Sequence, residues 1–179
     1  MSEPLPRHAP ATPDGTADGG PDDAAFRAAL GRFATGVAVM TAVTDGVAHG
    51  MTANAVSSVS LTPQLVLVCV ERTAVMAERV RTAGSFALSF LAADQVALSA
   101  WFADPTRPDE AQFAEVACRT EASGAPVLEG TVAWVDCRVE AIHTAGDHDI
   151  VVGEVLALGT GPADDPLLYY ASDYRRLQG

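Results

Sequence analysis

The chain has 179 residues, of which 49% are hydrophobic and 19% charged, and its formal net charge at pH 7 is −12. This length predicts one domain with a sizeable core. The acidic balance argues against nucleic acid and against an anionic membrane surface as partners, because both attract a basic patch. All eleven basic side chains are arginine, so a bound phosphate would be held by arginine, hydroxyls or backbone N–H groups.

The three cysteines, Cys69, Cys118 and Cys137, are widely spaced, and none stands at zinc-ligand spacing. They predict reduced thiols in a cytoplasmic protein. The N-terminus lacks a basic segment followed by an apolar run, so no signal peptide is expected. The uncharged stretch from Met51 to Val70 contains Thr, Asn, Ser, Pro and Gln throughout, so we do not expect it to span a membrane.

Residues 1–21 are rich in Pro, Gly, Asp, Ala and Thr and predict a disordered N-terminal tail. Residues 22–179 form the predicted domain. Asp22 can cap a helix that ends near Thr35-Gly36. Three apolar residues fall on one stripe of this helix: Phe26, Leu30 and Phe33.

The pattern then changes to that of β-strands. Val37–Thr44 and Val47–Ala53 flank the tight-turn pair Asp45-Gly46, which predicts a hairpin. Thr62-Pro63 marks a break in the chain. Leu65–Val70 is apolar on both faces, which is typical of a strand that is covered on both sides.

The chain after Val70 predicts two more helices and three more strands. The helices are expected over Ala74–Ala83, closed by Gly84, and from Asp94 to about Phe102. The strands are expected over Ser85–Leu91, Thr131–Thr144 and about His148 to Leu158, with a surface excursion over 103–126. Regular βαβ alternation is absent, so the pattern favours a mainly β fold, a closed antiparallel barrel with helices outside.

Several catalytic and nucleotide-binding motifs are missing. There is no GxGxxG after a strand, no GxxxxGK[ST], no HExxH and no GxSxG. A nucleotide cofactor would therefore bind without a Rossmann domain. His49, His143 and His148 do not stand at a defensible ligand spacing, and no metal site is predicted.

His148 differs from the other histidines, because it follows Gly146-Asp147 at the tip of a predicted long hairpin. That position places a titratable, planar side chain at the mouth of a barrel, where ligands often bind. An ordinary turn histidine is the alternative.

No acid–base pair or activated nucleophile stands out, which leaves hydride transfer between two bound heterocycles as a reaction class. A flavin ring needs backbone N–H groups, hydroxyls and an amide along its polar edge. The stretch Gly50–Ser60 supplies these groups: Thr52, Asn54, Ser57, Ser58 and Ser60. The other interpretation is that these side chains satisfy a kinked strand or a turn.

Four segments in order resemble the short-chain flavin reductase family, the reductase components of two-component flavin-dependent monooxygenases. They are RFATGVAVMTA, GMTANAVSSVSLTPQLVLVCV, GDHDIVVGEV and PLLYYASDY. The resemblance covers about Ala24 to Leu177. It implies an FMN-binding split barrel that is a homodimer with the flavin near the subunit interface. It also implies that NADH or NADPH reduces FMN or FAD, and that the reduced flavin passes to a separate oxygenase.

The resemblance implies functional positions as well. The flavin-binding positions are Thr35, Gly36 and Val37 beside the ring, Thr52, Ala53 and Asn54 at its edge, and Ser57, Ser58 and Ser60 along the ring and the ribityl–phosphate arm. Arg72 is the candidate for the flavin phosphate, with Arg79 or hydroxyls as the other groups left to contact it. A surface cation after a strand is the alternative for Arg72. Asp147 and the catalytic candidate His148 lie on the nicotinamide side. The chain departs from the family in having no lysine, and in having Ala171-Ser172 where relatives often have a glycine.

Two rival functions remain open. Split-barrel proteins also include oxidases and ferric reductases that retain their flavin. A non-enzymatic flavin-binding module is the other alternative, and it predicts no consumption of NAD(P)H when free flavin is added.

Overall fold

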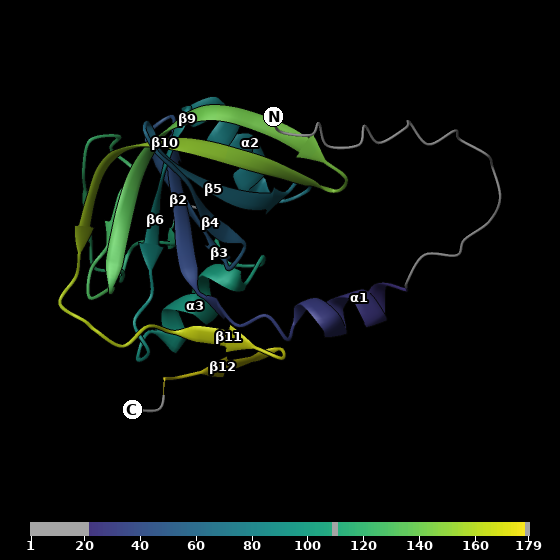
Figure 1. The fold of residues 1–179 in the computed structure, drawn as a ribbon. Coiled ribbons are helices and arrows are strands. Elements are labelled where there is room, and N and C mark those ends of the chain that lie inside the picture. The colour runs from purple at the N-terminus through teal and green to yellow at the C-terminus, as the bar shows by residue number, and fades with distance from the viewer. Residues whose placement is uncertain (1–21, 109–110, 178–179) are drawn as a thin grey trace, which may run out of the picture.

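A seven-stranded antiparallel sheet forms the body of the protein in the computed structural model, which describes residues 22–108 and 111–177 (Figure 1). Its strand order is β3-β2-β6-β9-β10-β5-β4. The strands are β2 (Ala38–Thr44), β3 (Val47–Ala53), β4 (Val56–Leu61), β5 (Gln64–Glu71), β6 (Ser85–Phe90), β9 (Ala133–Ala145) and β10 (His148–Thr160). The mainly β, barrel-like architecture predicted from the sequence is confirmed, but the edge strands β3 and β4 do not pair, so the barrel is open.

Two helices pack against this sheet. Helix α2 (Val75–Ala83) buries Met76, Ala77 and Val80 in the main core. It ends at Gly84, whose φ of 64° is left-handed, as the sequence predicted. Helix α3 (Val96–Ala103) buries Ser99 and Phe102 beside β3. No helix in the described part of the chain is long and apolar enough to cross a membrane.

Two small sheets complete the fold. Strand β1 (Thr35–Gly36) pairs with β11 (Leu168–Tyr170), which pairs with β12 (Asp173–Arg175). The excursion after α3 contains β7 (Cys118–Thr120), which pairs with β8 (Pro126–Leu128). The C-terminal hairpin therefore lies beside the start of the domain (Figure 1).

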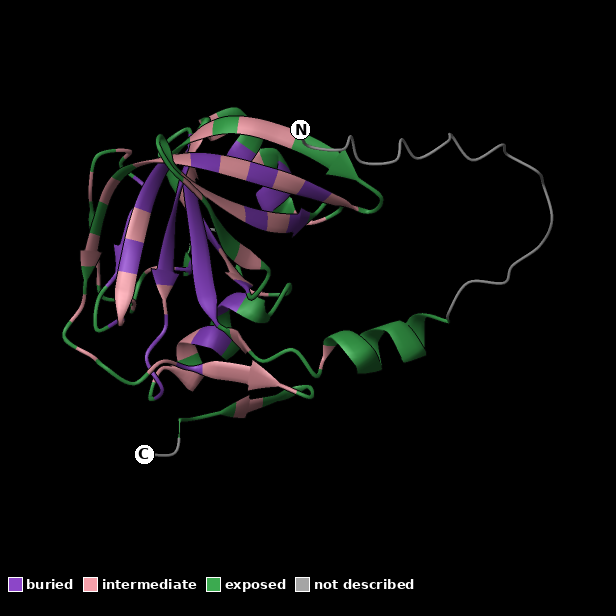
Figure 2. Ribbon diagram, viewed as in Figure 1, coloured by how far each residue is buried: buried purple, intermediate pink, exposed green. Residues whose placement is uncertain are grey.

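Helix α1 (Asp23–Leu30) begins as predicted, because the Asp22 side chain accepts a hydrogen bond of 2.8 Å from the Ala25 N–H. It ends earlier than predicted, at Gly31, since Thr35 and Gly36 pair with β11 instead of continuing the helix. The predicted apolar stripe is not buried: Phe26, Leu30 and Phe33 are 58%, 55% and 73% exposed. Figure 2 shows α1 exposed along its whole length. The predicted tail, residues 1–21, lies outside the described residues.

The prediction for β5 is wrong in one respect. Val68 and Val70 are buried as expected, but Leu65, Leu67 and Cys69 on the other face are only half-buried. An antiparallel sheet commonly packs one face on the core and leaves the other open. The hairpin prediction, by contrast, is confirmed: Asp45-Gly46 connects β2 to β3 with positive φ angles of 52° and 77°.

Candidate functional site

The connection from β3 to β4 is the centre of the candidate site. Asn54 lies between the two strands, and its amide donates a hydrogen bond of 3.3 Å to the Thr35 hydroxyl. The segment after Thr35 is held by the C-terminal region, because the Val37 N–H donates to the Leu167 carbonyl at 3.1 Å. Two of the predicted segments, 35–37 and 52–54, therefore lie side by side.

A cavity of about 360 Å³, which we call the β4 cavity, opens beside this connection. Five residues predicted to bind flavin line it: Thr35, Gly36, Asn54, Ser57 and Ser58. Apolar walls come from Val56 and Phe90. A Cβ atom built on Gly36 would meet no atom within 4 Å, so open space adjoins the backbone there. The β4 cavity thus combines hydroxyls, one amide, apolar surface and room for a flat ring.

A second cavity, the tyrosine cavity, has a volume of about 280 Å³ and is also lined by Asn54. It is lined by Val37, which was predicted to lie beside the ring, and by the predicted ring-edge residues Thr52 and Ala53. Ser99, Tyr169 and Tyr174 complete this part of its lining. The Thr52 hydroxyl donates to the Ser99 carbonyl at 2.7 Å. The hydroxyls of Ser99 and Tyr174 are hydrogen-bonded at 2.8 Å.

Sequence reasoning missed the two tyrosines and Ser99. Tyr169 and Tyr174 pack edge to face with ring centroids 5.6 Å apart. Their only sequence signal was PLLYYASDY, which carried the family resemblance but no residue role. Ser99 of α3 connects Thr52 to Tyr174, because its carbonyl accepts from the Thr52 hydroxyl and its own hydroxyl bonds to that of Tyr174. No local sequence pattern indicates this connection.

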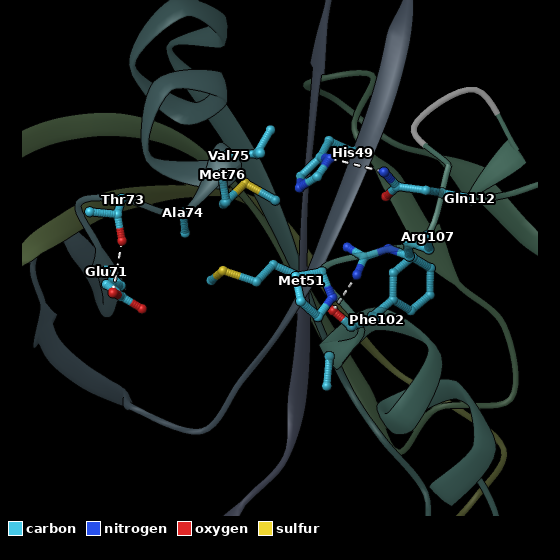
Figure 3. Close-up of a pocket in the computed structure, with 12 residues that line it drawn as sticks. His49, Met51, Glu71, Thr73, Ala74, Val75, Met76, Phe102, Arg107 and Gln112 are labelled. Atoms are coloured by element: carbon cyan, nitrogen blue, oxygen red, sulfur yellow. Dashed lines mark hydrogen bonds between the residues drawn. The ribbon is translucent and has the colours of Figure 1, made fainter.

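A third cavity, the α2 cavity of about 590 Å³, lies between β3, the start of α2 and the end of α3 (Figure 3). The Gly50 N–H donates to the Gln112 side-chain oxygen at 3.0 Å, and the Gln112 amide nitrogen lies 3.0 Å from His49 Nδ1. The amide nitrogen must donate, so Nδ1 accepts and the His49 ring proton is on Nε2. Met51 and Phe102 line both this cavity and the tyrosine cavity, so the two cavities adjoin.

Asp147 and His148 lie at the tip of the β9–β10 hairpin, as predicted. Their side chains hydrogen-bond at 2.7 Å, and this bond holds the pKa of the Asp147 carboxyl below its usual range. The Arg72 N–H donates to the Asp147 carbonyl at 2.9 Å, and the Arg72 guanidinium lies 3.5 Å from the Gly146 carbonyl. We refer to this group as the rim cluster.

The rim cluster does not line the β4 cavity or the tyrosine cavity. It is separated from the Asn54-Ala55 segment by β5, since Cys69 on β5 donates to the Ala55 carbonyl and Glu71 on β5 pairs with His148. Two strand spacings across the sheet and two residues along β5 put the His148 backbone about 12 Å from that segment. Arg72 lies with His148 and not with Ser57 and Ser58, so its assignment to the flavin phosphate stays a prediction.

Ser60 also lies apart from its predicted partners. Its hydroxyl accepts a hydrogen bond of 3.1 Å from the Thr62 N–H in the β4–β5 turn, beyond an irregularity in the register between Ser58 and Ser60. This contact fits the alternative in which a serine stabilises the turn. Within residues 22–108 and 111–177, no group of His, Cys, Asp and Glu side chains could hold a metal ion.

Residues 30–178 match the model of the flavin reductase like domain family. An NADH-dependent FAD reductase of Streptomyces globisporus is 41% identical over 87% of this chain and 86% of its own. The FMN reductase (NADH) SmoA of Agrobacterium fabrum is 42% identical over 89% of this chain and 88% of its own.

A solved structure agrees with these sequence relatives. BorF, the flavin reductase component of a bacterial two-component tryptophan halogenase, superposes with a TM-score of 0.83 at 39% identity, covering 88% of this chain and 99% of its own. The chain therefore belongs to the flavin reductase-like family. The resemblance to flavin reductases and the split-barrel fold that it implied are confirmed.

Proposed function

We propose that this protein is an NAD(P)H:flavin oxidoreductase that reduces FMN or FAD and supplies the reduced flavin to a separate oxygenase. One observation carries the proposal. Segments 35–37, 52–54 and 57–58 line two adjoining cavities that share Asn54. Relatives named NADH-dependent FAD reductase and FMN reductase (NADH) support the reaction class. A bacterial halogenase system with a flavin reductase component supports a separate oxygenase-type partner.

The residues around Asn54 fit a flavin. The Asn54 amide and the exposed hydroxyls of Ser57 and Ser58 supply hydrogen bonds to a polar ring edge and its ribityl arm. The open space beside Gly36 lets a flat ring approach the backbone. Bound flavin supplies the two-electron chemistry by accepting a hydride from the nicotinamide C4.

The role of His148 in this scheme is orientation. Its ring stands at the rim, on the same face of the sheet as Ser57. Leu67 and Glu71 share one face of β5, and residues that pair directly across two strands point to the same side. Ser57 pairs with Leu67, and His148 pairs with Glu71. We assign it the nicotinamide ring or its carboxamide, with Asp147 holding the imidazole by the 2.7 Å hydrogen bond. Hydride transfer needs no side chain as a base, which leaves His148 an orienting role. Replacement of His148 should therefore change nicotinamide affinity or the rate of hydride transfer and leave flavin affinity unchanged.

We infer further that the protein is a homodimer. The outward face of β5 and β10 presents Leu67, Cys69, Ile150 and Val152, all apolar and only half-buried. A second copy packed on this face would bury those side chains and place His148 at the interface. The compartment that we propose is the cytoplasm, which supplies reduced nicotinamide and keeps thiols such as Cys69 reduced.

One experiment tests the enzyme against its rivals. Purified protein is mixed with FMN or FAD and with NADH or NADPH, and nicotinamide oxidation is followed by absorbance. Turnover of added flavin supports the reductase. Flavin that stays bound through purification and does not exchange supports a flavin-retaining oxidase or ferric reductase. Flavin binding without nicotinamide oxidation supports a binding module.

A further inference from the structure

A buried carboxylate, that of Asp149, follows His148 directly in the chain. Asp149 is 1% exposed. Its Oδ2 forms an ion pair with the Arg81 guanidinium, and its Oδ1 accepts a hydrogen bond of 3.0 Å from the Thr144 hydroxyl. A buried charge is costly unless it is paired and hydrogen-bonded, so this arrangement strongly favours one position of the strand.

The partners of Asp149 tie the hairpin tip to its surroundings. Arg81 belongs to α2 and Thr144 to β9, so the carboxylate joins β10 to both. On the other side of β10, Arg72 directly follows the end of β5, and its N–H donates to the Asp147 carbonyl. The backbone on both sides of His148 is thus held, whereas the His148 side chain itself remains 45% exposed.

The ion pair between Asp149 and Arg81 is intact at neutral pH. Burial by itself raises the pKa of Asp149, but the hydrogen bonds from Arg81 and Thr144 and the charges of Arg81 and Arg72 outweigh it, and the pKa lies below its usual range. The carboxylate therefore stays ionised while the enzyme works.

We propose that Asp149 is a positioning residue for hydride transfer, fixing through Arg81 and Thr144 the hairpin tip from which His148 meets the nicotinamide. The inference rests on the proposed function, in which His148 orients the nicotinamide ring. Hydride transfer depends on reacting atoms held about 3–3.5 Å apart, and a shift of about 1 Å can cost about a hundredfold in rate. A loosened tip would lose part of that factor while the flavin cavities, on the other side of β5, stay unchanged.

The test compares two charge-neutralising variants on the same strand. Asp149→Asn removes the buried negative charge of the Asp149–Arg81 ion pair at the tip. Glu154→Gln removes the exposed Arg138–Glu154 pair, five residues further along β10 and about 17 Å away. We expect stopped-flow hydride transfer to slow about tenfold in Asp149→Asn and to stay unchanged in Glu154→Gln, with flavin affinity unchanged in both.

A double-mutant cycle separates positioning from general damage. In a His148→Ala background, Asp149→Asn should cause no further loss, because its effect passes through the imidazole. An equal loss in both backgrounds, or no loss in either, would overturn the inference. If His148→Ala alone changes neither nicotinamide affinity nor rate, the role of His148 in the proposed function fails, and the positioning role fails with it.

Two further measurements keep the test independent of folding and of bound cofactors. Thr144→Val removes one hydrogen bond at an exposed position, so the variant should fold, and we expect a smaller loss of hydride-transfer rate than in Asp149→Asn. Arg81→Lys retains the charge, so it should also fold, and we expect a near-normal rate. In ligand-free protein, Asp149→Asn should speed amide hydrogen exchange at 145–148 more than in α3. Uniform acceleration across the chain would mean global destabilisation and overturn the inference.

Discussion

Replacing Asn54 by Leu should weaken flavin binding without unfolding the protein. Asn54 is exposed in the ligand-free structure, and its one described side-chain hydrogen bond, to Thr35, is itself exposed. The variant therefore removes polar contacts to the ligand rather than core packing. Two amide hydrogen bonds to the ring, at about 0.5–1.5 kcal/mol each, correspond to about 1–3 kcal/mol of binding free energy. That loss raises the flavin dissociation constant by about 5–150-fold.

The assay for Asn54→Leu is titration of flavin absorbance or fluorescence with protein. A matched control is Gln64→Leu, which makes the same amide-to-leucine change at an exposed position beside the β4–β5 turn, at the far end of β5. Thermal unfolding should be nearly unchanged in both variants. Equal flavin affinity in Asn54→Leu and wild type would refute the assignment of the flavin edge to the β3–β4 connection.

Three other outcomes are expected. Gly36→Val fills open space beside the β4 cavity, so thermal stability should hold while flavin affinity falls about tenfold or more; unchanged affinity would exclude that cavity. In Gly50→Ala the new Cβ would stand 2.5 Å from the buried Phe102 ring, and we expect a loss of about 1–3 kcal/mol in urea unfolding. Folding lowers the pKa of Asp149, so the ionised carboxylate stabilises the folded protein. This contribution is complete above the unfolded pKa of about 3.9 and is lost as the pH falls through the lower pKa of the folded state. Acid unfolding of Asp149→Asn should therefore depend less steeply on pH than that of wild type, and identical profiles would contradict this.

Local signals predicted the elements whose formation depends on neighbours in the chain. Asp45-Gly46 fixed the β2–β3 hairpin, because both residues tolerate positive φ. Asp22 and Gly84 marked the ends of two helices through capping. The end of α1 was missed, since Thr35 leaves the helix to pair with Tyr169, a partner 134 residues away that no local pattern indicates.

The candidate site follows the same division. The composition of Gly50–Ser60 and the ordered family segments pointed to Asn54, Ser57 and Ser58, which share one cavity. Tyr174 was missed, because its contact with Ser99 depends on how the C-terminal hairpin docks on α3. Ser60 differs from its two neighbours because its hydroxyl bonds to the Thr62 N–H of the turn, which its place in a serine-rich run does not reveal.

The most direct test of the proposed function is the rate of nicotinamide oxidation by purified protein when free flavin is added. Each of FMN and FAD is paired with each of NADH and NADPH, and His148→Ala is measured beside wild type. We predict catalytic turnover of added flavin for at least one pair, with a slower hydride-transfer step in His148→Ala. Flavin binding with no nicotinamide oxidation for any of the four pairs would contradict the account.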